Sequence, residues 1–296
     1  MSGPVDWLSR AASEQSRPSD PALDFCLWPY APPQEAIPGA LRSSALLFAS
    51  FAAVDAGPEM AHLIPRLQGR WGRFATVWGL KWGQGQASWE FYFYDYAREQ
   101  RRYGVDDFVA VTGDLLACAL PSPDRVPYFM FSVEIEPRHL TGAPLEQIDI
   151  YIGNPGSTVS SGICYGQTRT GRHLRNFYFF FDAETQSEDI LDKLTESAFL
   201  KQESLHIPSL LWPEMEGAQT IVVANKQNRD SLYFSRIKVD QLIHFMERLA
   251  FPDALQRYVC ENRDRLAHHL FDVGWDYDVG PQGQIVPSKG SIYGIV

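Results

Sequence analysis

Four tyrosines recur at matching places in separate parts of the chain. Tyr92, Tyr151, Tyr233 and Tyr293 each lie in a run of alternating polar and apolar residues, and each falls among the polar positions of its run. A tyrosine ring attracts cations through its face, and its hydroxyl hydrogen-bonds to polar ligands. A single tyrosine in a strand is more often a packing residue, so the prediction depends on the recurrence. The pattern predicts a polar interior lined with tyrosine.

These runs form five consecutive pairs, and each pair predicts a β-hairpin. In SLYFS (231–235) the tyrosine shares a face with two serines, while leucine and phenylalanine point the other way. The paired strands are predicted at 74–82 with 88–96, at 128–135 with 147–153, at 163–169 with 175–183, twice within 220–249, and at 270–279 with 289–296. Helical patterns lie between most pairs, at about 98–119, 187–199, 239–249 and 253–268, after two helices within 39–69.

Ten strands with one apolar and one polar face predict an α+β fold. It is a single ten-stranded antiparallel barrel of five sequential hairpins, surrounded by helices that bury the apolar strand faces. Closure also removes the exposed edges that an open sheet of ten strands would present. Residues 1–36, rich in Pro, Ser and Ala, predict an irregular N-terminal lead-in, and residues 37–296 a single helix-sheathed barrel domain.

Composition narrows the class of function. The net charge of −10 argues against nucleic acid as a partner. The four cysteines form no CxxC pair, which is typical of a cytoplasmic protein with reduced thiols. The N-terminal residues have no apolar signal core, and no apolar run approaches the ~20 residues that span a bilayer, so we expect no membrane association. Fingerprints of zinc proteases, serine hydrolases, P-loops and dinucleotide binding are not present.

Over about residues 74–296, the repeat layout and four short motifs resemble the ABBA prenyltransferases, soluble enzymes with an antiparallel barrel inside a ring of helices. The motifs are the acid Glu90 in the second strand, two basic residues three apart in TGRHLR (170–175), SLYFS after NKQNR (225–229), and Lys289 with Tyr293 in the last strand. Gln147 and Asp149 stand where many members of the family have a lysine.

The resemblance implies a role for each of these positions. Glu90 is the candidate catalytic residue, which would accept a hydrogen bond from the acceptor phenol or indole N–H, or orient a magnesium-bound diphosphate. Basic residues would stabilise the charge growing on the diphosphate, and tyrosines would shield the allyl cation from water. The diphosphate candidates are Lys81, Arg172, Arg175, Lys226 and Lys289, and the pocket candidates are Tyr92, Tyr151, Tyr165, Tyr178, Tyr233 and Tyr293.

The expected function is therefore a prenyltransferase of secondary metabolism. It would move a C5 or C10 allylic group, for instance from dimethylallyl diphosphate, to an aromatic or indole small molecule or to a peptide side chain. No protein-bound metal is expected, and Mg²⁺ stays open because members of the family differ in needing it. The alternative is a non-catalytic barrel that binds an apolar ligand or a partner protein in its tyrosine-rich lumen.

Overall fold

Ten antiparallel strands form one closed barrel in the computed structural model, which describes residues 5–120, 126–154, 157, 159–200 and 206–296. Each strand pairs with its neighbours in sequence, and β1 (Thr76–Gly83) pairs with β10 (Ile285–Ile295) to close the circle. The predicted barrel of five hairpins is confirmed. The other strands are β2 (Gln86–Tyr94), β3 (Met130–Ile135), β4 (Ile148–Gly153), β5 (Ser160–Thr168), β6 (Gly171–Asp182), β7 (Thr220–Lys226), β8 (Asp230–Ile237) and β9 (Phe271–Val279).

Alternation along each strand separates two apolar layers. In β2, Phe91 and Phe93 are buried in the large core between the barrel and its helices, whereas Tyr92 belongs to a smaller cluster inside the barrel. Each large apolar side chain buried in the outer layer contributes about 1.5–3 kcal/mol to folding. The outer layer therefore supplies most of the stability, and the inner face is left for polar and aromatic groups.

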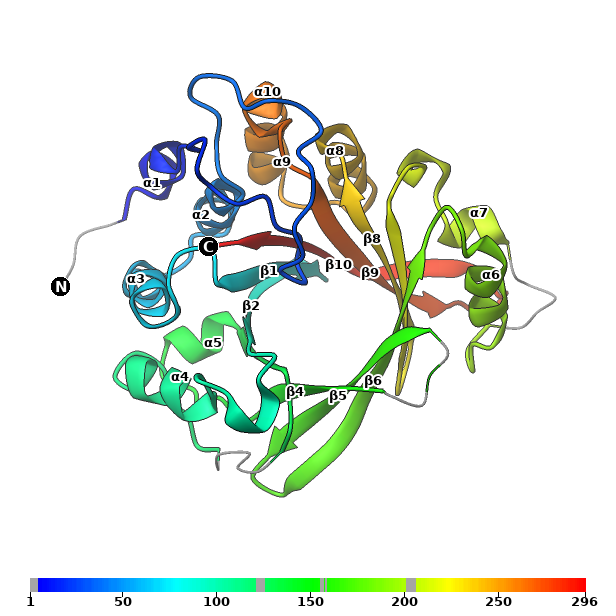
Figure 1. Ribbon diagram of the computed structural model, residues 1–296, viewed down its shortest axis with the longest axis horizontal. Helices are drawn as coiled ribbons and strands as arrows, with labels where there is room; N and C mark the ends of the chain where they lie inside the picture. The colour runs from blue at the N-terminus through cyan, green and yellow to red at the C-terminus, as the bar shows by residue number, and fades with distance from the viewer. Residues whose placement is uncertain (1–4, 121–125, 155–156, 158, 201–205) are drawn as a thin grey trace.

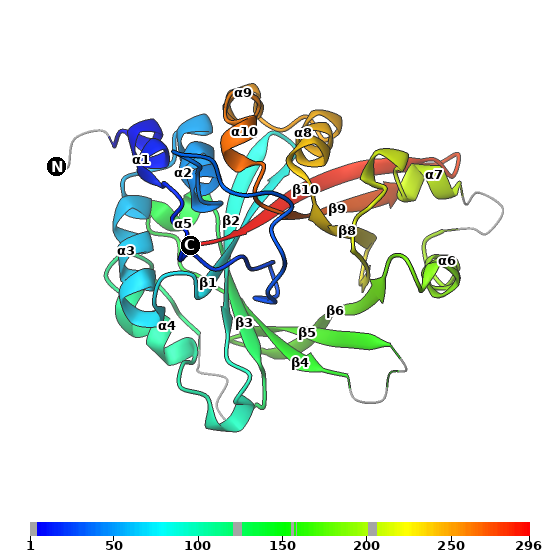
Figure 2. The ribbon, with the colours of Figure 1, turned by 45° about the horizontal axis from the view of Figure 1, so that its top comes forward.

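Helices lie around the outside of the barrel (Figure 1). The group α1, α2 and α3 lies beside β1, and α8, α9 and α10 lie beside β8 and β9, as the tilted view also shows (Figure 2). Among the described residues, no helix has the length and apolarity needed to cross a membrane. The helices are α1 (Trp7–Ser13), α2 (Ser44–Ala53), α3 (Glu59–Trp71), η1 (Arg98–Gln100), α4 (Val105–Thr112), α5 (Pro137–Leu140), α6 (Ser187–Thr195), α7 (Ile207–Leu210), η3 (Pro213–Met215), α8 (Val239–Arg248), α9 (Asp253–Glu261) and α10 (Arg263–Leu266).

Two local expectations need correction. The helix expected over about 98–119 is interrupted, because Arg98 has a positive φ and the Asp95 carboxylate accepts hydrogen bonds from the backbone of Arg102 and Tyr103. The lead-in is not irregular throughout. It contains helix α1, whose residue Trp7 is buried and donates its indole N–H to the carbonyl of Ala56.

The lead-in also reaches the barrel itself. Its loop at residues 23–30 lies across one end of the barrel (Figures 1 and 2), and the ring of Phe25 lies 5.3 Å from that of Tyr293. The hydroxyl of Tyr94 donates to the Phe25 carbonyl at 2.8 Å, and the Arg236 guanidinium pairs with the buried Asp24 at 2.9 Å. These contacts make the loop part of the barrel wall at that end.

Candidate active site

Five tyrosines form a continuous belt around the lumen. Each ring neighbours the next, with centroids 5.9 to 6.4 Å apart, and the last neighbours the first. Burial raises the pKa of every one of these hydroxyls, so the phenols are neutral at physiological pH. The members of this tyrosine belt are Tyr92, Tyr151, Tyr178, Tyr233 and Tyr293.

Two glycines give the belt its geometry. Gly274 lies opposite Tyr233 across the strand pair β8–β9, and a Cβ there would approach the tyrosine ring to 2.3 Å. Gly79 lies opposite Tyr293, where a Cβ would come within 2.9 Å of the ring. Real Cβ atoms do not tolerate such distances, so each tyrosine lies flat over a strand only because its partner has no side chain.

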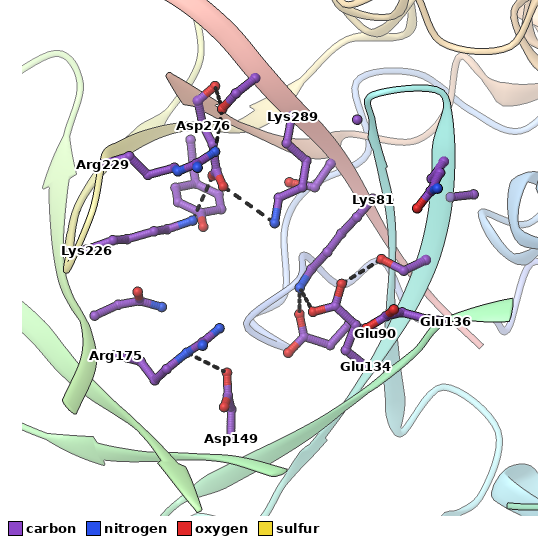
Figure 3. A pocket seen from close by; sticks show the side chains of 18 of the residues that line it. Lys81, Glu90, Glu134, Glu136, Asp149, Arg175, Lys226, Arg229, Asp276 and Lys289 are labelled. Carbon is purple, nitrogen blue, oxygen red and sulfur yellow. Dashed lines mark hydrogen bonds and ion pairs between the residues drawn. The ribbon is translucent and has the colours of Figure 1, made fainter. Parts of the chain in front are cut away.

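On one side of the belt lies a charged chamber of about 460 Å³, at the end where the hairpins β1–β2, β7–β8 and β9–β10 turn. Charged side chains point into it from opposite walls (Figure 3). They comprise five basic residues (Lys81, Arg175, Lys226, Arg229 and Lys289) and five acids (Glu90, Glu134, Glu136, Asp149 and Asp276).

Lys81 connects two of these acids. Its amine lies 2.6 Å from Glu90 and 2.7 Å from Glu134 (Figure 3). Burial opposes the lysine charge, but the two carboxylates outweigh it and raise the pKa of Lys81 well above its ordinary value. In the same way the pKa of Glu134 falls to about 2, because Lys81 and Lys289 overcome the cost of burying its charge. This pair is therefore ionised over the physiological range.

Glu90 also receives hydrogen bonds from two hydroxyls. Tyr92 donates to it at 2.5 Å, and Ser132 donates to its other oxygen. A carboxylate has about four acceptor positions, so the three contacts with Lys81, Tyr92 and Ser132 leave room for one more donor. Glu90 lies on the charged side of the belt and connects to it through Tyr92.

A second charged group faces the first across the chamber. Asp276 pairs with Lys226 at 2.7 Å and with Lys289 at 3.5 Å, and it accepts a hydrogen bond from Ser231. Burial lowers the pKa of Lys289, and the charges of Lys81 and Lys226 lower it further. An added anion would relieve that electrostatic cost, which makes Lys289 a cation suited to a negatively charged ligand.

The two arginines of TGRHLR separate. Arg175 lines the chamber and lies 3.8 Å from Asp149, whereas Arg172 is exposed, is not among the lining residues, and donates to Gln167. A β-bulge causes the difference, because the register of β5 and β6 slips between Cys164 and Tyr165 and leaves Arg175 as the extra residue. Strict alternation would put Arg172 in phase with Tyr178, so its predicted place in the lumen was wrong.

Tyr165 is the second misplaced residue. It packs against the core outside the barrel, whereas the preceding residue Cys164 belongs to the inner cluster. Alternation explains this, because neighbouring residues of one strand face opposite sides. The structure brings the other predicted residues to the charged chamber or the belt, where their roles stay predictions: Lys81, Glu90, Arg175, Lys226 and Lys289, with Tyr92, Tyr151, Tyr178, Tyr233 and Tyr293.

Several residues of the site were not predicted. Glu134 and Ser132 share the polar phase of FSVEI (131–135), so alternation alone could have found them. Arg229 lies in the turn after β7, where no periodicity fixes direction, and it lies 3.6 Å from Asp278 at the chamber rim. The alternation of Asp272, Asp276 and Asp278 in β9 indicates lumen rim or solvated surface, and Asp276 is a buried residue that lines the chamber.

Beyond the belt lies a second, apolar chamber of about 210 Å³. Aromatic residues dominate its wall, and the lead-in loop contributes Phe25, Cys26 and Trp28. The belt tyrosines line both chambers. The remaining lining residues are Tyr94, Tyr96, Arg98, Phe129, Met130, Gly153, Ser160, Ser161, Gly162, Phe180 and Val222.

A protein-only metal site does not fit these residues. Within the described ranges, no group of three His, Cys, Asp or Glu side chains is placed to hold a metal ion. Mg²⁺ often takes only one or two protein carboxylates and completes its shell with water and phosphate oxygens. The Mg²⁺ left open by the sequence would therefore depend on a bound phosphate.

Comparison with known proteins identifies the architecture. No family model matches the sequence, and no curated protein matches it either. Among solved structures, the chain is similar to AnaPT from Neosartorya fischeri, an ABBA prenyltransferase, with a TM-score of 0.50 and 9% sequence identity over 83% of this chain and 90% of that chain. At this identity the likeness shows the fold alone: the closed ten-stranded barrel with surrounding helices of the ABBA architecture.

Proposed function

We propose that this protein is a prenyltransferase that moves an allylic C5 or C10 group from its diphosphate to an aromatic acceptor. The observation that supports this most is the tyrosine belt between a charged and an apolar chamber. An allylic diphosphate has the same division, with a polyanionic head and an apolar tail. The similarity to AnaPT, a prenyltransferase, agrees with the proposal.

The charged chamber would bind the diphosphate. Lys226 and Lys289 would leave Asp276, their common partner, and turn toward the phosphate oxygens, with Arg175 approaching from the opposite wall. When the allylic C–O bond breaks, its electron pair leaves with the diphosphate. Fixed cations in a water-poor cavity stabilise that developing charge, an effect that typically contributes several kcal/mol.

The belt would hold the allyl cation. Each neutral tyrosine ring presents a face to it, and each cation–π contact contributes about 0.5–2 kcal/mol. Because the belt tyrosines are neutral phenols, they do not capture the cation as phenolates would. The closed circle of rings would also keep out water, which otherwise converts the cation to an alcohol.

Glu90 would receive the proton. Attack of an aromatic carbon on the cation forms the new C–C bond, and loss of the ring proton restores aromaticity. Glu90 lines the charged chamber and accepts a hydrogen bond from the Tyr92 hydroxyl, which would relay the proton to it from an acceptor on the other side of the belt.

Calorimetry with dimethylallyl diphosphate tests the proposal, with and without Mg²⁺. We expect micromolar binding by the native protein and at least tenfold weaker binding by Lys289→Met, and we expect prenylated product from an indole or phenol acceptor. Arg102→Gln, an exposed charge change outside both chambers, serves as the control. The proposal fails if the native protein binds neither dimethylallyl nor geranyl diphosphate under either condition.

One observation favours the alternative of a non-catalytic binding barrel. The five basic and five acidic residues of the charged chamber balance, so an anion must displace existing ion pairs. An apolar ligand in the second chamber would need no such displacement. Binding of aromatic ligands without any binding of allylic diphosphates would support this alternative.

A further inference from the structure

The apolar chamber contains one charged side chain among the described residues that line it. Arg98 lies at its outer rim, on the exposed segment that follows β2. Gly153 shares the lumen phase of β4 with Tyr151 and Asp149, so its missing side chain leaves space on the lumen side. A Cβ built at Gly153 would lie 3.6 Å from Nη2 of Arg98, which places the guanidinium over that space.

The guanidinium is not neutralised by the groups around it. Within the described parts of the chain, Arg98 makes no ion pair, in contrast to Arg175 and Arg229 at the other chamber. A cationic group thus lies at an otherwise largely aromatic cavity, and it can donate hydrogen bonds to an oxygen anion.

The dimensions point to a small molecule. An apolar cavity of about 150 Å³ holds benzene, so 210 Å³ accommodates one or two fused rings with a short substituent. The lead-in loop narrows the outer end, because Tyr96 donates to the Cys26 carbonyl at 3.0 Å and the Trp28 ring lies 6.3 Å from Phe180. An extended peptide would have to displace this loop.

From these observations we propose that the apolar chamber is the acceptor site and that it selects planar aromatic molecules with an anionic group, such as a carboxylate, which binds Arg98. This inference rests on the prenyltransferase proposal and specifies its acceptor. The aromatic ring lies against the belt from one side while the diphosphate lies on the other. Arg98 is then a specificity-determining residue at the outer rim, with no contact to the reacting atoms.

A matched pair of ligands tests the acceptor site without relying on turnover. Indole-3-propionate and indole-3-propanamide have the same shape and differ in charge. We expect the native protein to bind the carboxylate about tenfold more tightly in calorimetry. Arg98→Gln should abolish that preference, Arg98→Lys should keep part of it, and Arg102→Gln, a charge loss four residues away outside the chamber, should keep all of it. Thermal melts confirm that each variant is folded.

The outcomes separate this inference from the proposed function. Equal binding of the two ligands by the native protein, or a preference that survives Arg98→Gln, overturns the acceptor site even if prenyl transfer occurs. An Arg98-dependent preference in a protein that binds no dimethylallyl diphosphate supports the acid-binding chamber and overturns the transferase. In Arg98→Gln we expect unchanged affinity for dimethylallyl diphosphate, and a weakened affinity contradicts the division into two sites.

Discussion

The two chambers share one barrel wall but are lined by opposite kinds of side chain. Along the lumen face of β2 the order is Ser88, Glu90, Tyr92 and Tyr94, so a single strand passes from charge to aromatic ring. The last strand does the same from Lys289 to Tyr293. Alternation therefore decides whether a side chain faces the lumen, whereas its position along the strand decides which chamber it lines. This gradient is what separates a polyanion site from an apolar site.

The strongest test of this comparison is Lys81→Met, which removes a cation from the charged chamber. Buried Glu90 would then lie beside half-buried Glu134 without its own ion-pair partner, and Lys289 would be the remaining nearby cation. Breaking a buried ion pair by removing one partner typically costs about 3–5 kcal/mol. We expect a loss of that order in the free energy of unfolding, measured by urea titration, and at least a hundredfold loss of prenyl transfer.

The double variant Lys81→Met with Glu134→Gln is the control for Lys81→Met. Neutralising Glu134 removes the unpaired charge, so the double variant should recover most of the lost stability while donor affinity stays low. If Lys81→Met is as stable as the native protein, the chamber does not depend on charge pairing.

The next largest effect concerns the belt that divides the chambers. In Gly274→Ala the new methyl group would overlap the ring of Tyr233. Overpacking of this kind costs about 1–3 kcal/mol, and displacement of one ring would open the belt to water. We expect about tenfold slower transfer and a larger share of prenyl alcohol among the products, measured by chromatography.

Gly162→Ala is the matched control for Gly274→Ala. Gly162 lines the apolar chamber, but a Cβ there would make an ordinary contact of 3.6 Å. Its product ratio should equal that of the native protein. Equal ratios in Gly274→Ala as well would show that the belt does not exclude water.

The fold was accessible from sequence because period-two alternation repeats in ten strands. The same rule found most of the belt, whereas the lysines of the charged chamber came from the family resemblance. It failed at Arg172, because a bulge adds a residue to one strand and reverses the phase beyond it, and no local pattern announces that bulge. Alternation also could not predict that the lead-in contacts the barrel. Phe25 contacts Tyr293 and Asp24 pairs with Arg236, and each pair is separated by more than two hundred residues in sequence.

The end of the barrel covered by the lead-in loop also has a carboxyl group, that of Asp272, whose protonation affects stability. Buried Asp272 accepts a hydrogen bond from the backbone N–H of Phe25 at 3.0 Å. Burial, together with the nearby charge of Asp24, raises its pKa to about 7. A raised carboxyl pKa means that the folded protein holds the proton more tightly than the unfolded chain. The resulting stability is complete below about pH 4 and is lost as the pH rises through 7.

Urea titrations between pH 5 and pH 8 measure this loss at Asp272. Over that interval the free energy of unfolding of Asp272→Asn should fall by about 2–3 kcal/mol less than that of the native protein, because the variant has no charge to bury. Asp192→Asn, at an exposed position of α6, should leave the pH dependence unchanged. Parallel curves for Asp272→Asn and the native protein would contradict the raised pKa.

The smallest expected effect separates two arginines that the sequence treats alike. Arg172 is exposed and bonds to Gln167 outside the lumen, so Arg172→Gln should change stability by no more than about 0.5 kcal/mol and leave the affinity for dimethylallyl diphosphate unchanged. Arg175→Gln removes a cation that lines the charged chamber and should weaken that affinity severalfold in calorimetry. Both substitutions remove one positive charge from the same strand, so long-range electrostatics affects both nearly equally. A difference in donor affinity between the two variants is therefore an effect of the bulge, which turns one side chain into the lumen and the other to the outside. Equal losses of affinity would show that both arginines reach the donor.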